Sequence, residues 1–153
     1  WLPDTPTRTW GLSGGTVGQK VPQFLFPEGT TVLPDAYLIC VPESAGSVVV
    51  PDHAQVFHIP DDLISTKQGV LRIHRPLASK GEKIRYVTVD EAIYQNRLPW
   101  DVGAGGGGQG LERMNTSAFG VDPLNWRAGP VGGTPGRSLG DRLLRHPFKG
   151  GDK

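Results

Sequence analysis

Hydrophobic and polar residues alternate over short stretches of this chain, and turn-forming residues interrupt them at intervals of roughly ten residues. Within 70–74, Leu71 and Ile73 fall on one face of an extended strand, while Arg72 and His74 fall on the other. One face of this strand should therefore meet water. The apolar pattern resumes after a polar stretch, so residues 70–89 predict a β-hairpin.

The longest apolar run, residues 36–41, lies between Pro34 and Pro42. A continuous apolar run of this length is typical of a strand buried on both faces, and we expect it to be the central strand of a sheet. Cys40 lies within it and is the only cysteine, which excludes an intramolecular disulfide. A buried structural thiol is the expected state of Cys40.

Other short strands are expected along the chain, and the first of them, within residues 8–13, is expected at a sheet edge. The remaining strands are predicted at 24–26, 48–50, 56–59, 110–114 and 125–128. Many short strands separated by turns are typical of an all-β sandwich or barrel. One helix is expected, at 138–145, where Ser138 and Asp141 match a capping box.

Composition and charge narrow the classes of function. The chain has 22 glycines and 14 prolines in 153 residues, which disfavours long helices. Its net charge is +1, so no global field attracts nucleic acid or an anionic membrane. No apolar stretch approaches the roughly 20 residues that a membrane-spanning helix needs.

Motifs for catalysis are missing or lack their context. Residues 103–108 satisfy the letters of G-x-G-x-x-G, but no buried strand precedes them and no helix follows, so we interpret them as a flexible inter-strand loop. There is no G-x-S-x-G elbow. The adjacent carboxylates Asp90 and Glu91 would point to opposite faces of a strand. We therefore expect that the protein is not an enzyme.

Metal binding is weakly indicated. His53 and His58 lie near aspartates but lack the spacing of a zinc site, so no metal centre is predicted there. A weak calcium site stays open as an alternative, because residues 115–125 offer Asn115, Thr116, Asp122 and backbone carbonyls as oxygen ligands. No other cofactor is expected.

Three segments stand in the order and spacing that closes a known family. They are Gly-Gln-Gly-Leu-Glu-Arg-Met at 108–114, Asp-Pro-Leu-Asn-Trp-Arg-Ala at 122–128, and Gly-Thr-Pro-Gly at 133–136. The chain resembles the bacterial lamin-tail domain, an immunoglobulin-like β-sandwich, over roughly residues 10–136 and most strongly at 108–136. Gly110 departs from the serine usual in the family. The residues carrying the resemblance are Trp100, Leu111, Glu112, Arg113, Asp122, Pro123, Asn125, Trp126, Arg127, Thr134, Pro135 and Gly136.

The resemblance implies structural roles for these residues. Trp126 would be a buried anchor, and residues 134–136 a turn that ends the fold. The family's usual first strand has no counterpart upstream of Trp10. We therefore expect an open sheet edge that a segment of a partner or of upstream polypeptide covers, since Pro3 and Pro6 suit a strand poorly.

The chain divides into two parts. Residues 1–136 are expected to form a β-sandwich of short antiparallel strands with Gly- and Pro-rich loops, and residues 137–153 a basic tail with a short helix. The tail has a net charge of +3. Its basic residues are candidates for contact with a partner protein. Those candidates are Arg137, Arg142, Arg145 and Lys149.

The absence of catalytic motifs and the resemblance together predict a non-catalytic protein-interaction or scaffolding module. It would be a subunit or domain of a larger exported or envelope assembly, extracellular or periplasmic. Its partners would be other protein chains, with no specific nucleic acid and no small-molecule substrate. The alternative is an accessory domain of a multidomain exported hydrolase or nuclease.

Overall fold

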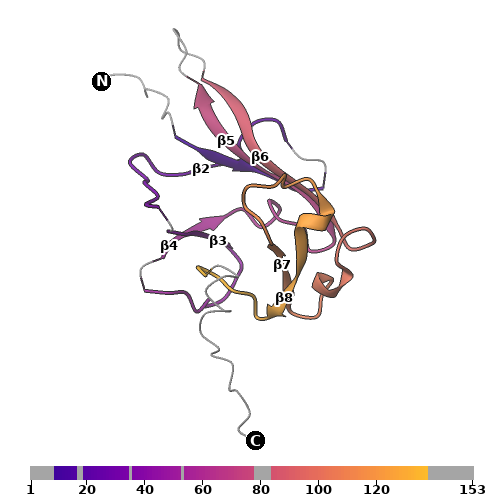
Figure 1. Ribbon diagram of the computed structural model, residues 1–153. Helices are drawn as coiled ribbons and strands as arrows, with labels where there is room; N and C mark the ends of the chain where they lie inside the picture. Colours follow the sequence, from indigo (N-terminus) through magenta and orange to yellow (C-terminus); the bar gives the residue numbers. More distant parts are fainter. Residues whose placement is uncertain (1–8, 17–18, 35, 53, 78–83, 138–153) are drawn as a thin grey trace, which may run out of the picture.

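The computed structural model describes residues 9–16, 19–34, 36–52, 54–77 and 84–137 (Figure 1). Their regular structure is β-strand, apart from two short 3-10 helices, η1 (Val102–Ala104) and η2 (Pro123–Asn125). The prediction of a mainly β chain is thus confirmed. The helix predicted at 138–145 lies outside the described residues, and so do Arg142, Arg145 and Lys149 of the basic tail.

The largest sheet has four strands in the order β2-β1-β5-β6, all antiparallel. These are β1 (Gly11–Ser13), β2 (Phe24–Leu25), β5 (Gln68–Leu77) and β6 (Arg85–Gln95). Strands β5 and β6 confirm the predicted hairpin and extend it at its open end. The pairing shifts register between Ile73 and His74, which marks a β-bulge.

The prediction that the first strand lies at an edge is wrong, because β1 pairs with β2 on one side and with β5 on the other. A glycine permits this position: a Cβ added to Gly11 would lie 2.6 Å from the carbonyl oxygen of Phe24. The edges of the sheet are β2 and β6. Strand β2 is only two residues long and lies between Pro22 and Pro27, which limits pairing with a further strand.

Strands β3 (Leu38–Pro42) and β4 (Gln55–Ile59) form a separate two-stranded parallel sheet. The expectation of a central, doubly buried strand at 36–41 is therefore wrong: β3 pairs with β4 alone, and only Val41 in it is buried. An apolar run indicates burial but does not specify pairing partners. The strand predicted at 48–50 is absent, and Val49 is 91% exposed.

The third sheet is an antiparallel pair, β7 (Gln109–Arg113) and β8 (Trp126–Val131), which confirms the strands predicted at 110–114 and 125–128. The pairing shifts register between Gln109 and Leu111. Glu112 lies opposite Arg127 and Arg113 lies opposite Trp126. The residues of the family resemblance thus meet across one strand pair.

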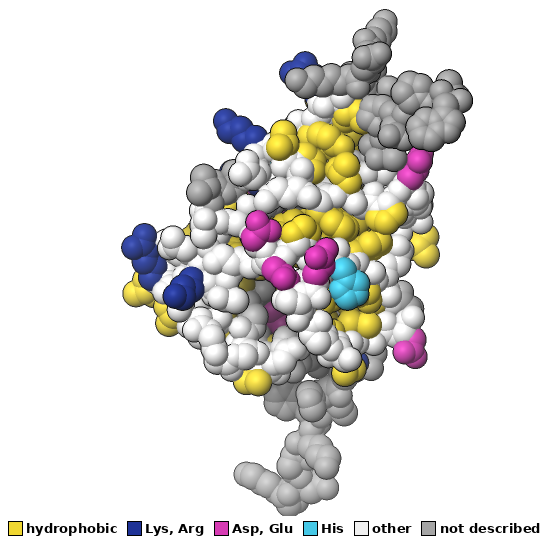
Figure 2. Space-filling view, turned by 180° about the vertical axis from the view of Figure 1, so that it is seen from behind, with side chains coloured by type: hydrophobic (Ala, Val, Ile, Leu, Met, Phe, Trp, Pro, Cys, Tyr) yellow, Lys and Arg dark blue, Asp and Glu magenta, His cyan; other side chains and the backbone are white. Residues whose placement is uncertain are grey.

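The main hydrophobic core lies between the four-stranded sheet and the β3–β4 pair. Its buried members are Leu12, Phe26, Ile59 and Leu63. The ring of Phe26 packs edge-to-face against Phe57 at a centroid distance of 5.1 Å, which joins the two sheets. This core is small, and many large apolar side chains reach the surface, as Figure 2 shows on one face of the molecule.

The side chains of β5 that are buried and exposed are not those that the sequence predicted. His74, expected to meet water, is fully buried, whereas Ile73 on the other face is 36% exposed. The cause is a long-range contact: Gln19, from the connection between β1 and β2, lies against His74's neighbour Ser13. In the part of the chain that the structure describes, no helix is long and apolar enough to cross a membrane.

Candidate functional site

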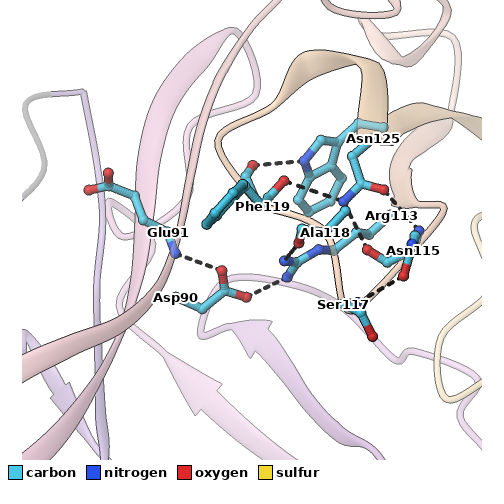
Figure 3. Close-up of polar contacts among 10 residues, drawn as sticks. Asp90, Glu91, Arg113, Asn115, Ser117, Ala118, Phe119 and Asn125 are labelled. Carbon is cyan, nitrogen blue, oxygen red and sulfur yellow. Dashed lines mark hydrogen bonds and ion pairs between the residues drawn. The ribbon is translucent and has the colours of Figure 1, made fainter.

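Two of the residues that carry the sequence resemblance, Arg113 and Asn125, lie close together near β6 (Figure 3). Arg113 of β7 forms an ion pair through Nη1 with Asp90 of β6, and its Nη2 donates to the carbonyl of Ala118. Its guanidinium carbon lies 6.0 Å from the centroid of the Trp126 ring. One side chain therefore links two sheets and the loop at residues 115–125, here called the 115–125 loop.

Asn125 organises the 115–125 loop from inside. It is 6% exposed, and its Oδ1 accepts a hydrogen bond from the amide of Asn115 at 2.9 Å. Its Nδ2 donates to the carbonyls of Asn115 at 2.9 Å and Phe119 at 3.3 Å. The loop is thus wound around one buried amide group (Figure 3).

Trp126 fixes the loop at a third point. Its Nε1 donates to the carbonyl of Gly120 at 2.8 Å. Gly120 is buried against β6, where an added Cβ would lie 2.4 Å from the carbonyl oxygen of Glu91. The loop therefore crosses the outer edge of β6 at this residue, and glycine is needed for the close approach.

Hydrogen bonds within the loop occupy several of the oxygens that the sequence offered for calcium. The carbonyls of Asn115 and Phe119 accept from the Asn125 side chain, and the Asn115 Oδ1 accepts from the Ser117 amide at 2.9 Å. Asp122 caps η2 by accepting from the amide of Leu124 at 3.0 Å. Over the described ranges no group of three or more His, Cys, Asp or Glu side chains could hold a metal ion, and calcium binding by Asn, Thr and carbonyl oxygens stays a prediction.

Trp100 is the most deeply buried aromatic residue of this region. It is 2% exposed, and its ring lies 6.0 Å from that of Trp126, tilted by 44°. Trp126 is only half-buried, so the expectation that it is the buried anchor is better met by Trp100. Leu111 is also half-buried.

Asp101, next to Trp100, accepts a hydrogen bond from the first residue of the glycine-rich run at 103–108. Its carboxylate accepts from the amides of Ala128 at 2.8 Å and Gly103 at 2.9 Å, and these bonds hold its pKa below the ordinary value. The run begins with η1 and leads into β7, so no helix follows it. A dinucleotide cradle needs a helix N-terminus at that place.

The end of the fold is fixed by Glu112 and Thr134. The hydroxyl of Thr134 donates to Oε1 of Glu112 at 2.6 Å, and the following residues, with Pro135 and Gly136, form the predicted turn. Gly136 has a φ of 69°, and an added Cβ would lie 2.9 Å from the ring of Pro51. Gly136 in this turn therefore lies against Pro51, in the connection between β3 and β4.

The remaining predicted residues in the described part of the chain are Pro123, Arg127 and Arg137. Pro123 is the first residue of η2, a position that suits proline. Arg127 is exposed on β8. Arg137, the one tail residue of the four within the described part, is exposed, with its amide bonded to the Thr134 carbonyl at 3.1 Å.

Large apolar side chains are displayed on the outside of the 115–125 loop and at its entry. Phe119 is 82% and Leu124 75% exposed, and Met114 and Val121 are exposed as well. Side chains of this kind are ordinarily buried, and several exposed ones within one short segment are a candidate interaction site. The sequence analysis considered the oxygen ligands of this segment and did not identify its exposed apolar side chains.

A buried Ser-His pair was also missed. Ser13 Oγ lies 2.7 Å from Nε2 of His74, and both residues are 0% exposed. The hydroxyl donates to the carbonyl of Gln19 at 2.6 Å, so it does not hand its proton to the imidazole. A nucleophile needs access to substrate and a base positioned for its proton. This pair has neither, and no sequence motif identified it.

Cys40 is half-buried in β3, and burial raises the pKa of its thiol to about 11. A raised pKa leaves little of the reactive thiolate, as expected for a structural cysteine. His58 is exposed on β4, while His53 lies outside the described residues.

Comparison with known proteins gives no relative: no family model, no curated protein and no solved structure matches this chain. The β-rich architecture with several sheets agrees with the family resemblance in the sequence.

Proposed function

We propose that this chain is a non-catalytic protein-interaction or scaffolding module of the lamin-tail, immunoglobulin-like β-sandwich type. It binds another protein chain through the apolar side chains of the 115–125 loop. The observation that carries the proposal is the display of Phe119 and Leu124, 82% and 75% exposed, on a loop braced from inside.

The bracing matters because it removes much of the entropy cost of binding. Arg113, Asn125 and Trp126 each donate a side-chain hydrogen bond to a carbonyl within the loop. A loop already held in one conformation loses little freedom when a partner packs against it. Exposed aromatic and aliphatic side chains on such a support are suited to act as anchors in a partner's pocket.

Charge favours a protein partner over nucleic acid or an anionic membrane. Residues 114–125 contain no lysine and no arginine, and Asp122 is their one charged side chain. Phosphate backbones and anionic lipids are bound through basic residues, which this surface does not offer. An apolar patch with one acidic residue fits the surface of another protein.

The assignment to the lamin-tail type rests on the sequence, and the way its closing residues interlock supports it. Trp100, Arg113, Asn125 and Trp126 are joined by stacking and hydrogen bonds around one loop. Residues chosen by a resemblance alone need not contact one another. We further propose, from the sequence, that the module acts in an exported or envelope assembly.

The test is site-specific crosslinking in cells that produce the protein. A photoreactive benzoylphenylalanine replaces Phe119, whose exposure lets the larger ring be added without repacking a core. The control variant carries the same group in place of Leu33, which is 71% exposed and distant from Phe119 in the sequence. We expect the variant at Phe119 to form a discrete adduct with one protein, identified by mass spectrometry, and the control variant to form none.

A second step measures that adduct partner directly. The purified partner should bind the wild-type chain, and Phe119→Ser with Leu124→Ser should weaken binding by at least tenfold, the effect of losing about 1.4 kcal/mol. Leu33→Ser should leave binding unchanged. Absence of an adduct at Phe119, or adducts with lipid alone, would contradict the proposal.

A further inference from the structure

The strand pair β1–β5 carries a series of polar contacts on the face opposite the core residue Leu12. Ser13 of β1 contacts His74 of β5 at 2.7 Å, and His74 Nδ1 lies 3.4 Å from Thr88 Oγ1 of β6. Both Ser13 and His74 are 0% exposed. The imidazole is therefore fully buried, with a hydroxyl near each of its two ring nitrogens.

The hydrogen-bond acceptors in this series of contacts determine which atoms carry the protons. The Gln19 carbonyl only accepts, so the Ser13 hydroxyl donates to it at 2.6 Å. Ser13 Oγ is then the acceptor for His74 Nε2–H. In the neutral ring this leaves Nδ1 as an acceptor, which faces the hydroxyl of Thr88.

The same contacts hold a surface segment in place. Gln19 and the residues up to Gln23, here called the Gln19 segment, pack over this face of the sheet. The Gln19 carbonyl also accepts from Arg72 Nη1 at 3.2 Å, and Gln23 Oε1 accepts from the Gly14 amide at 2.8 Å. The Gln23 amide donates to the Leu12 carbonyl at 2.8 Å.

We propose that Ser13, His74 and Arg72 form a proton-sensitive clamp on the Gln19 segment, closed when the imidazole is neutral and open when it is protonated. The charged groups around His74 are few. Arg72 is on the same strand, Glu91 of β6 is paired with Arg72, and Lys20 in the segment is exposed. Strands β1 and β2 contribute no titratable side chain.

Opening follows from the electrostatics. A proton taken from solvent at Nδ1 places a second cation near Arg72 on a ring that is 0% exposed, and Glu91 is already paired with Arg72. The burial of His74, and next the charge of Arg72, lower the pKa of the imidazole. Movement of the Gln19 segment would admit water to the imidazolium and remove one hydrogen-bond partner from Arg72 and Ser13.

Nuclear magnetic resonance tests the clamp through two reporters, the amides of Gly14 and Gln23. Their hydrogen-exchange protection, corrected for the intrinsic pH dependence of exchange, should fall about tenfold for each pH unit over which His74 titrates. In His74→Gln the protection should be independent of pH between 8 and 5. His58→Gln, a change at an exposed histidine of β4, should keep the wild-type pH dependence.

Retention of the wild-type pH dependence by His74→Gln would overturn the clamp. Should that variant fail to fold, the wild-type chain decides the matter: the ring signals of His74 and the amide shifts of Gly14 and Gln23 must share one titration midpoint. Separate midpoints, or a His74 titration without a change in the two amides, would refute the proposal.

Discussion

Gly120 shows how much depends on single residues in the 115–125 loop. Its amide plane lies against the edge of β6 while its carbonyl accepts from Trp126 Nε1 at 2.8 Å. A side chain at this place would meet backbone, which cannot give way as a flexible side chain can. The loop, its carbonyl contacts and the exposed Phe119 all depend on this close approach.

Gly120→Ala should therefore destabilise the fold. The new Cβ would lie 2.4 Å from the Glu91 carbonyl oxygen and 2.9 Å from Asp90 Oδ1, and we expect a loss of about 1–3 kcal/mol in the free energy of unfolding. Gly110→Ala is the matched control, because nothing lies within 4 Å of its added Cβ. Chemical denaturation should find that variant within about 0.5 kcal/mol of wild type. Equal effects of the two changes would contradict this account.

Cys40 should react slowly while the chain is folded. Burial raises its pKa from 9.0 to about 11, so the thiolate fraction at pH 8 is about a hundredfold smaller than for a free thiol. Labelling with a thiol reagent at pH 8 should therefore be slow in buffer and fast in denaturant. Fast labelling of the folded chain would show that the thiol is not protected.

At the scale of elements, the β7–β8 pair is attached to the rest of the molecule by a few side chains. Arg113 links it to β6, and Asp101 links the η1 turn to β8 through the Ala128 amide at 2.8 Å. Trp100 and Trp126 fill the space between these two links. The pair is therefore positioned by aromatic packing and hydrogen bonds rather than by membership of a larger sheet.

The two tryptophans should differ in their effect on stability. Trp100 is 2% exposed, so Trp100→Ala should cost about 3–5 kcal/mol in the free energy of unfolding. Trp126→Ala should cost less, because Trp126 is half-buried. Trp126→Phe keeps a ring but removes the donor to Gly120, for a loss of about 1 kcal/mol. Urea denaturation would measure the three values, and a larger cost at Trp126 than at Trp100 would reverse this order.

At the scale of the whole molecule, three small sheets share one modest core, and stability depends on polar contacts as well as on apolar burial. The buried His74 makes this dependence sensitive to pH. Its pKa is lower in the folded state than the ordinary 6.5. The unfolded chain therefore binds more protons than the folded chain once the pH falls below about 6.5.

The free energy of unfolding should thus be constant above about pH 7 and decline as the pH falls from about 6.5 toward 5. Asp61 and Asp101 have lowered pKa values because backbone amides donate to them, and their stabilising effect is lost only below their ordinary value of 3.8. The two windows are separate. Thermal melting in a series of buffers from pH 8 to pH 5 would measure the decline, and a flat profile would exclude an effect of His74.

Local sequence patterns determined much of the β-structure. The hairpin at 70–89 and the strands at 110–114 and 125–128 follow from local patterns that act over a few positions, and the turn at 134–136 from the residues of the family resemblance. Among the residues of the family resemblance, Arg113, Asn125 and Trp126 lie together around the 115–125 loop, a contact that the sequence did not predict. The lamin-tail assignment itself, the function and the exported location remain predictions.

Only the tertiary structure decided which strands pair and which faces are covered. The period of a strand does not indicate its neighbours, so β1 became an inner strand and β3 joined a separate parallel pair with β4. His74 is buried where Ser13 and the Gln19 segment lie against it, and two carbonyls of the 115–125 loop accept from Asn125. These outcomes depend on contacts between residues far apart in the chain, which alternation and spacing do not encode.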